Sequence, residues 1–251
     1  MTEHVYIDGE FVPAERANIS IFDAGLMHGA GLFETLRAYN GRLFRLSDHL
    51  DRLVNSAKAL SLPYPADLDR LTADLHKLLQ LNGLSDARLR LMVTAGNLRL
   101  AGRNEDNAEP KPTVIATATA MTPYPEMYYK RGMTVLICEY RQGTDPLCGH
   151  KTLGYLPRLI SLRQAQTKQC GEALWFTHQN LLAEGAISNV FLIHKGELKT
   201  PPLDTPVLPG ITRKLVIELA RADGLPVSET PLTINDLLSA DEVFLTNSIM
   251  Q

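Results

Sequence analysis

Cysteine is scarce in this chain, which holds only Cys138, Cys148 and Cys170 among its 251 residues. Three cysteines cannot all pair, and no two of them form a Cys-x-x-Cys arrangement. A disulfide framework and a zinc site are therefore both disfavoured. We expect three reduced thiols and no bound metal.

Excess basic charge and long apolar runs are also absent. The formal net charge is −3 and the pI is near 6.2, so nothing in the charge favours a polyanionic partner such as nucleic acid. No apolar stretch approaches the roughly 18 residues that a membrane span needs. The first residues have the pattern of a strand and a turn rather than of a targeting peptide. We therefore expect a cytosolic protein that binds neither nucleic acid nor membrane.

The rest of the composition, with 45% hydrophobic and 21% charged residues, is typical of a globular enzyme with one large domain or two ordinary ones. Two prolines in the segment 121–126 mark the best boundary. This boundary predicts an N-terminal lobe over residues 1–120 and a C-terminal lobe over residues 121–251. Strand and helix patterns alternate in both lobes, which indicates an α/β or α+β fold.

Periodicity and turn signals predict the elements of both lobes. A hairpin is expected over residues 5–12, a tight turn at Asn40-Gly41, and a helix with Ser47 as its N-cap. Further helices are predicted over 67–81, over 153–169 and after Thr212. Further strands are predicted over 87–94, 114–118, 133–138, 173–176, 188–193 and 243–245.

Lys151 has the setting that most suggests covalent chemistry. It follows a turn-like segment, 143–146, and precedes the apolar helical pattern of residues 153–162. A lysine lodged between a strand and a helix can be partly desolvated, and desolvation makes an amine a better nucleophile toward an aldehyde. The alternative is an ordinary surface lysine, because lysine is rarely buried.

Three other segments offer polar groups. Pro209-Gly210-Ile211-Thr212 precedes an apolar helical pattern, so its amides and hydroxyl would lie at a helix N-terminus, where phosphate binds. The alternative there is an ordinary capped helix start. Glu184 is expected in a turn before an apolar strand; it is either half buried beside a cationic or proton-sharing partner, or solvated. Thr246-Asn247-Ser248 follows a strand and is either a set of ligand groups or a loop.

Eight motifs follow one another along essentially the whole chain. They are Ile-Asp-Gly-Glu-Phe-Val-Pro, Gly-Leu-Phe-Glu-Thr-Leu-Arg, His49-Leu-Asp-Arg-Leu, Arg-Leu-Met-Val-Thr-Ala-Gly, His-Lys-Thr-Leu-Gly-Tyr-Leu, Ala-Glu-Gly-Ala-Ile-Ser-Asn-Val-Phe, Pro-Gly-Ile-Thr-Arg and Ser-Ala-Asp-Glu-Val-Phe-Leu-Thr-Asn-Ser. Together they resemble the class IV, or fold-type IV, family of pyridoxal-phosphate enzymes. That family contains branched-chain aminotransferases, D-amino-acid aminotransferases and aminodeoxychorismate lyases.

The resemblance implies a role for each candidate residue. Lys151 would form the Schiff base with pyridoxal phosphate and then act as the general base, and Glu184 would keep the pyridinium nitrogen protonated. Tyr155 would lie near the cofactor's phenolic oxygen. The phosphate would be bound by Arg52, Ile211 and Thr212, with Asn247 or Ser248 completing the set. The pocket residues that separate substrates would be His28, Phe33, Arg90, Thr94 and Asn97.

The resemblance also implies an assembly and an activity. The family's active site lies between two lobes and beside a dimer interface, which implies a homodimer. The run 145–153 and the Thr-Asn-Ser-Ile-Met ending look more like aminodeoxychorismate lyases, whereas branched-chain enzymes usually carry a Gly-Thr pair near the final motif. The expected reaction is conversion of 4-amino-4-deoxychorismate to 4-aminobenzoate and pyruvate, a step of folate biosynthesis. The alternatives are an aminotransferase for branched-chain or D-amino acids and a non-catalytic dimeric pseudoenzyme.

One pocket residue and three departures from the family pattern leave alternatives open. Arg90 would bind a substrate carboxylate, or else be a surface charge on an alternating strand. Gly154 occupies a position where relatives often have asparagine, and Ala30 one where they often have aspartate, so local hydrogen bonds should differ. Relatives continue beyond the position of Gln251, which implies either a missing C-terminal tail or a pocket that closes differently.

Overall fold

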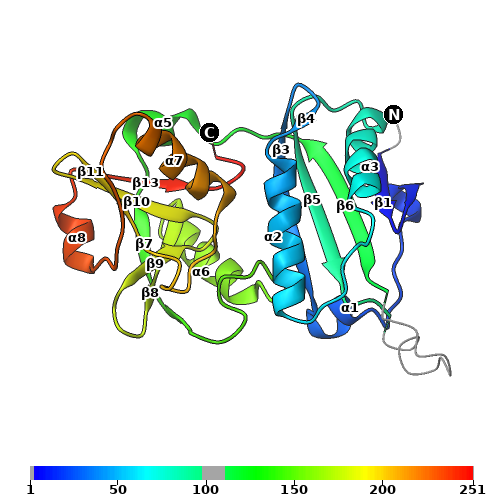
Figure 1. The fold of residues 1–251 in the computed structure, drawn as a ribbon, viewed down its shortest axis with the longest axis horizontal. Coiled ribbons are helices and arrows are strands. Elements are labelled where there is room, and N and C mark those ends of the chain that lie inside the picture. Colours follow the sequence, from blue (N-terminus) through cyan, green and yellow to red (C-terminus); the bar gives the residue numbers. More distant parts are fainter. Residues whose placement is uncertain (1–2, 98–110, 251) are drawn as a thin grey trace. The chain divides into compact units, whose positions relative to one another are not determined.

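The computed structural model describes residues 3–97 and 111–250 and confirms a mixed α/β fold (Figure 1). The chain divides into two compact units. Unit 1 consists of Met1–Thr122 and Lys151–Gly154, and unit 2 consists of Pro123–His150 and Tyr155–Gln251. The first passage from unit 1 to unit 2 falls inside the segment 121–126.

Unit 1 is built on a six-stranded sheet with the strand order β2-β1-β6-β5-β3-β4. All of its paired strands are antiparallel. The strands are β1 (His4–Ile7), β2 (Glu10–Pro13), β3 (Gly31–Tyr39), β4 (Arg42–Leu43), β5 (Ala87–Thr94) and β6 (Thr113–Ala120). The helices are α1 (Ala24–His28), α2 (Leu46–Ala59) and α3 (Leu68–Leu81), with a 3-10 turn at Ala14–Arg16. Helix α2 packs on β3, and α3 packs on β1 and β6 (Figure 1).

The alternation of side chains along β3 and β5 gives this sheet two different faces. Leu36 and Leu89 are opposite each other in the register and are fully buried in the core under α2 and α3. Glu34 lies two residues from Leu36 and therefore also faces α2. Phe33 and Arg90 have the opposite parity and lie on the other face.

Two local predictions for unit 1 are confirmed. Asn40 and Gly41 have φ values of 49° and 74°, the left-handed pair that a tight hairpin turn with the observed β3–β4 pairing requires. The helix predicted over residues 67–81 is α3, and the side chain of Asp67, which was not singled out as a cap, accepts a hydrogen bond of 2.8 Å from the Arg70 N–H at its start. The turn and the helix depend on neighbouring residues, which is why the sequence alone reveals them.

The predicted start of α2 is wrong. The helix begins at Leu46, so Ser47 lies inside its first turn, and Arg45 occupies the N-cap position with φ 50° and no side-chain cap. The Arg45 guanidinium instead pairs with Asp48 at 3.2 Å. The tight turn into the helix, rather than a serine hydroxyl, therefore determines where it begins.

Unit 2 contains two smaller sheets. The four-stranded sheet has the order β12-β11-β10-β13, and the three-stranded sheet has the order β7-β8-β9. Its strands are β7 (Val135–Gln142), β8 (Glu172–Thr177), β9 (Leu182–Gly185), β10 (Asn189–His194), β11 (Glu197–Thr200), β12 (Val227–Glu229) and β13 (Glu242–Thr246), and its helices are α5 (Glu126–Arg131), α6 (Leu156–Thr167), α7 (Ile211–Ala222) and α8 (Ile234–Ser239). Among the described residues of both units, no helix combines the length and the apolar character needed to cross a membrane.

The segment Lys151–Gly154 differs from its prediction. The sequence pattern places it in the C-terminal lobe and begins a helix at residue 153, but α6 begins only at Leu156, with a proline in its first turn. Thr152 instead forms a bridge with Leu32 at β3. The Phe33 N–H donates to the Lys151 carbonyl at 2.9 Å, and the Leu153 N–H donates to the Gly31 carbonyl at 3.0 Å. These backbone bonds join Lys151 to unit 1.

Candidate functional site

Lys151 is half-buried in unit 1, beside the sheet face that carries Phe33. Its Nζ lies 4.5 Å from the centroid of the Phe33 ring, and the Arg90 guanidinium carbon lies 3.7 Å from the same centroid. The ring itself is only 2% exposed. Each cation is attracted to the ring, but the two repel each other. The arrangement therefore favours binding of an anionic group on this face.

Glycine allows Lys151 to approach the sheet so closely. A Cβ atom at Gly31 would lie 2.6 Å from the Val93 carbonyl oxygen and 2.8 Å from Leu153 Cδ1. Both distances are shorter than side chains tolerate, so only glycine fits here. The glycine of the Gly-Leu-Phe-Glu motif thus fixes the position of the lysine backbone.

The other predicted pocket residues of unit 1 have different surroundings. Thr94 is 4% exposed; its hydroxyl donates to Asp23 Oδ2 at 2.8 Å and accepts from the Gly96 N–H at 3.0 Å. Asn97 pairs with Asp23 in an isolated bridge, and its Nδ2 donates to Ser20 Oγ at 3.0 Å. These bonds commit the Thr94 hydroxyl to the fold around Asp23.

His28 is the last residue of α1 and is exposed. It is followed by Gly29 in the left-handed conformation, with φ 66°. Of the five predicted pocket residues, Phe33 and Arg90 are brought together with Lys151, because both cations lie over the Phe33 ring.

Arg52 is anchored by a buried carboxylate that sequence reasoning missed. Its Nε donates to Glu34 Oε1 at 2.8 Å and its Nη2 to Glu34 Oε2 at 2.5 Å, while His49 Nδ1 lies 2.7 Å from Glu34 Oε2. Burial alone would raise the pKa of Glu34, but the charge of Arg52 and the hydrogen bonds of both partners outweigh it and lower the pKa to about 2. The signal for this residue was a carboxylate at a core-facing position of an apolar strand.

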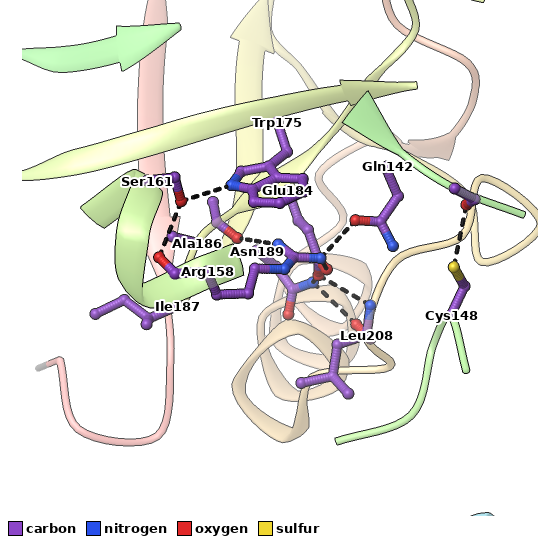
Figure 2. A network of polar contacts seen from close by, with 12 residues as sticks. Gln142, Cys148, Arg158, Ser161, Trp175, Glu184, Ala186, Ile187, Asn189 and Leu208 are labelled. Atoms are coloured by element: carbon purple, nitrogen blue, oxygen red, sulfur yellow. Dashed lines mark hydrogen bonds and ion pairs between the residues drawn. The ribbon is translucent and has the colours of Figure 1, made fainter. Parts of the chain in front are cut away.

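Glu184 lies in β9, not in a turn as predicted, and is only 5% exposed. The predicted need for a cationic partner is met by Arg158 of α6, whose Nη2 donates to Glu184 Oε1 at 2.6 Å (Figure 2). Glu184 Oε2 accepts from the Leu208 N–H at 2.9 Å and from Asn189 Nδ2 at 3.4 Å. The carboxylate is thus rigidly held by three hydrogen bonds.

Arg158 and its surroundings were not singled out from the sequence. Its Nη2 also donates to Gln142 Oε1 at 2.5 Å and its Nη1 to the Gly185 carbonyl at 2.8 Å. The guanidinium carbon lies 4.4 Å from the Trp175 ring centroid. Arg158 stands between apolar residues of a helical pattern, and this placement gives no sign of which carboxylate it binds.

The remaining predicted ligands also lie in unit 2. Ile211 and Thr212 open α7, and the N-cap Gly210 supplies no side-chain hydrogen bond to the first turn. The Tyr155 hydroxyl donates to the Ala186 carbonyl at 2.8 Å.

The segment after β13 is a turn held by Asn247, whose Oδ1 accepts from the N–H groups of Ile249 and Met250 at 2.8 and 2.7 Å. The Asn247 side-chain oxygen is therefore engaged, and half-buried Ser248 is the better ligand candidate. Thr246 is 8% exposed, and its Oγ1 has no hydrogen-bond partner among the described residues. A buried hydroxyl without a partner is costly unless a ligand satisfies it.

These groups of unit 2 fit a phosphate ester. The first-turn amides of α7 and the positive end of its dipole attract an anion. Thr246 is paired with Asn189 across β10 and β13, and Asn189 Oδ1 occupies the space that a side chain at Gly210 would need. The hydroxyl without a partner and the helix start are therefore both next to Asn189.

Comparison with known proteins gives one consistent result. The sequence model described as amino-transferase class IV matches residues 31–251. A putative branched-chain-amino-acid aminotransferase of Methanocaldococcus jannaschii is 38% identical over 247 residues, 97% of this chain and 84% of the relative. An aminodeoxychorismate lyase of Bacillus subtilis is 33% identical over 252 residues, 98% of this chain and 84% of the relative.

Solved structures agree with these sequence matches. The branched-chain aminotransferase of Thermoproteus uzoniensis, in a crystal structure with norvaline, superposes with a TM-score of 0.89 and 27% identity. The match covers 100% of this chain and 85% of that one.

Proposed function

Because this chain belongs to the class IV aminotransferase family, whose members depend on pyridoxal phosphate, we propose that it is an aminodeoxychorismate lyase. The reaction splits 4-amino-4-deoxychorismate into 4-aminobenzoate and pyruvate. A proton leaves the ring carbon that bears the amino group, and the enolpyruvate substituent leaves the neighbouring carbon. The two products account for every atom of the substrate, so no second substrate is needed.

The observation that best supports the lyase is the turn after β13. In the sequence Thr246-Asn247-Ser248, the Asn247 side chain caps two backbone N–H groups. A Gly-Thr pair, which branched-chain enzymes usually carry there, lacks the side-chain amide that forms these bonds, and a threonine hydroxyl supports such turns only more weakly. The identity to the Bacillus subtilis lyase over 98% of the chain points the same way.

The residues of both units have the chemistry that pyridoxal phosphate needs. We assign the phosphate to the amides of Ile211 and Thr212, to the Thr212 hydroxyl, to Ser248 and to the anchored guanidinium of Arg52. The partnerless Thr246 hydroxyl, next to Asn189, extends the same set of donors. When bound, the cofactor withdraws electrons from the carbon attached to the substrate nitrogen and so makes its proton acidic.

The chain's own side chains then divide the work. Lys151 Nζ would hold the cofactor aldehyde and would be the base that takes the proton from the substrate's ring carbon. The Glu184 carboxylate would keep the cofactor ring nitrogen protonated, and the Tyr155 hydroxyl, whose proton goes to the Ala186 carbonyl, would lie near the phenolic oxygen. Arg90, beside Lys151 at the Phe33 ring, binds a substrate carboxylate.

An aminotransferase for branched-chain or D-amino acids is the second candidate. It is supported by the 38% identity to the Methanocaldococcus jannaschii relative, which exceeds the identity to the lyase. The same lysine would then move a proton from the substrate's α-carbon to the cofactor carbon. In either case we propose a cytosolic homodimer, with exposed apolar side chains such as Leu156 (66%) and Leu159 (52%) of α6 available for an interface.

The lyase and the aminotransferase reactions differ in whether they need a keto acid to accept the amino group. We expect repeated turnover of 4-amino-4-deoxychorismate without any keto acid, releasing 4-aminobenzoate and pyruvate in equal amounts. With L-leucine or D-alanine, we expect at most slow bleaching of the cofactor's visible absorbance. Steady transamination of leucine with 2-oxoglutarate, together with no 4-aminobenzoate, would establish the aminotransferase instead. Lys151→Ala is the inactive control for both assays, and inertness of the native protein in both would indicate a pseudoenzyme.

A further inference from the structure

Arg158 is fixed by more contacts than an arginine on an exposed helix surface usually has. Its guanidinium reaches Glu184, Gln142 and the Gly185 carbonyl, and it lies against the indole ring of Trp175 (Figure 2). Its side chain is 15% exposed, and that of Glu184 is 7% exposed. Such a buried ion pair, with its arginine bonded to three acceptors, is rigid, and its electrostatic effect is strong because little water screens it.

The carboxylate of Glu184 has one acceptor position left. A carboxylate offers about four lone-pair sites. Oε2 accepts from Leu208 and Asn189, and Oε1 accepts from Arg158. The open site is therefore on Oε1, the same oxygen that Arg158 binds.

Two charges thus compete at a single oxygen. The positive charge of an arginine at a carboxylate oxygen repels a second cationic N–H that approaches the same oxygen. We propose that Arg158 is a positioning residue that weakens the hold of Glu184 on the proton of the cofactor ring nitrogen. How strongly the cofactor ring withdraws electrons would then depend on both Arg158 and Glu184, and not on Glu184 alone. This inference rests on the proposed role of Glu184, but not on which reaction the enzyme performs.

Other titratable groups are packed near this pair. Glu172 of β8 accepts from Ala173, Ala186, Ile187 and Ser188, and burial raises its pKa despite these hydrogen bonds. Burial also raises the pKa of the Cys138 thiol of β7 and of the Cys148 thiol, which keeps both uncharged near neutral pH. Arg158 is therefore the charged group in direct contact with Glu184.

The test uses the holoenzyme loaded with pyridoxal phosphate that carries ¹⁵N in its ring. The ¹⁵N chemical shift reports protonation of that nitrogen without any substrate. In Arg158→Met, the pH at which the signal changes should rise by about one to three pH units, as expected for removal of a nearby charge. Arg158→Lys, which keeps the charge, should stay close to the native protein. Arg163→Met, an exposed arginine of the same helix, is the matched control.

A second variant predicts the opposite sign. Gln142→Leu frees Nη2 of its second acceptor, strengthens the bond to Glu184, and should lower the pH of the signal change. Because Arg158 touches the ring of Trp175, thermal melts followed by circular dichroism, rather than tryptophan fluorescence, should report whether each variant keeps its fold. If Arg158→Met fails to fold, the lysine and Gln142 variants decide the matter.

An unchanged signal in Arg158→Met, or equal shifts in the methionine and lysine variants, would overturn the inference. An unshifted signal in Gln142→Leu would do the same. If the ¹⁵N signals of the variants shift as expected but the native enzyme forms no 4-aminobenzoate, only the proposed reaction is contradicted.

Discussion

Asn189 donates its side-chain amide to the carbonyl oxygen of Leu208 at 2.9 Å. The N–H of the same Leu208 donates to Glu184, so this residue is held at both ends just before the N-cap Gly210 of α7. The carboxylate assigned to the ring nitrogen and the helix start assigned to the phosphate therefore belong to one rigid arrangement within unit 2.

Gly210→Ala should disturb this arrangement by steric pressure alone. Gly210 has φ −65°, which any residue adopts, but an added Cβ would collide with Asn189 Oδ1. We expect a loss of about 1–3 kcal/mol in the free energy of unfolding, as for overpacked cores, together with weaker cofactor binding. Urea denaturation and cofactor titration would measure the two effects.

The collision also predicts a coupling between the two residues. Because Asn189→Ala removes the obstructing oxygen, Gly210→Ala should cost less in that background, and a double-mutant cycle would show it. Gly154→Ala is a suitable control, since its Cβ would meet nothing closer than Thr152 Oγ1 at 3.7 Å. Additive effects of the two substitutions would refute the steric explanation.

Glu184→Gln should lower turnover far more than cofactor retention, because it removes the charge that faces the ring and leaves the phosphate ligands in place. Thr212→Val should do the reverse. Loss of one hydrogen bond to a charged group costs roughly 1.5–3 kcal/mol, so the cofactor dissociation constant should rise about ten- to hundredfold.

Arg52 is a less selective probe than Thr212. Its removal would also leave Glu34 without its cationic partner, so Arg52 variants should lose both cofactor affinity and stability. Equal effects of the Glu184 and Thr212 substitutions on turnover and on affinity would contradict the division of roles.

Glu34 should make unit 1 sensitive to acid. Its pKa is lowered from 4.5 to about 2 in the folded protein, so the stabilisation is complete above about pH 4.5 and is lost as the pH falls toward 2. Each pKa unit corresponds to about 1.4 kcal/mol, giving a contribution of roughly 3 kcal/mol. Thermal melts between pH 7 and 2 should show a smaller acid-induced loss in Glu34→Gln than in the native protein.

The acid-stability experiment needs, as a control, a carboxylate that contributes little to the free energy of unfolding. Glu126 pairs with Lys130 on the surface and has a side chain that is 78% exposed, so Glu126→Gln should leave the acid profile almost unchanged. Parallel profiles for Glu34→Gln and the native protein would show that the buried carboxylate is not responsible.

Lys151 should carry the cofactor covalently. Borohydride reduction of the holoenzyme followed by peptide mass mapping should find the pyridoxyl group on this residue, and Lys151→Arg should show none. A modified lysine elsewhere, or no modification after reconstitution, would remove Lys151 from its proposed role.

Sequence patterns predicted the features that neighbouring residues determine. The Asn40-Gly41 turn depends on bonds within a few residues, and β5 was predicted with its observed bounds because alternation along one strand is visible directly. The partner of Glu184 was not predictable, because Arg158 meets it only after α6 and β9 pack. The extended course of Lys151–Gly154 likewise depends on pairing with a strand far earlier in the chain, and this pairing overrode the local helical pattern.

The placement of Lys151–Gly154 in unit 1 has a consequence for how the protein is made. During synthesis the ribosome must add Pro123–His150, which belong to unit 2, before the last piece of unit 1 becomes available. A nascent chain ending near Thr122 therefore lacks the segment that pairs with Leu32 and Phe33. Unit 1 is completed only when the residue proposed to hold the cofactor has emerged, so an early-terminated chain has all six strands of the sheet but lacks the segment that bonds to β3 and the reactive amine.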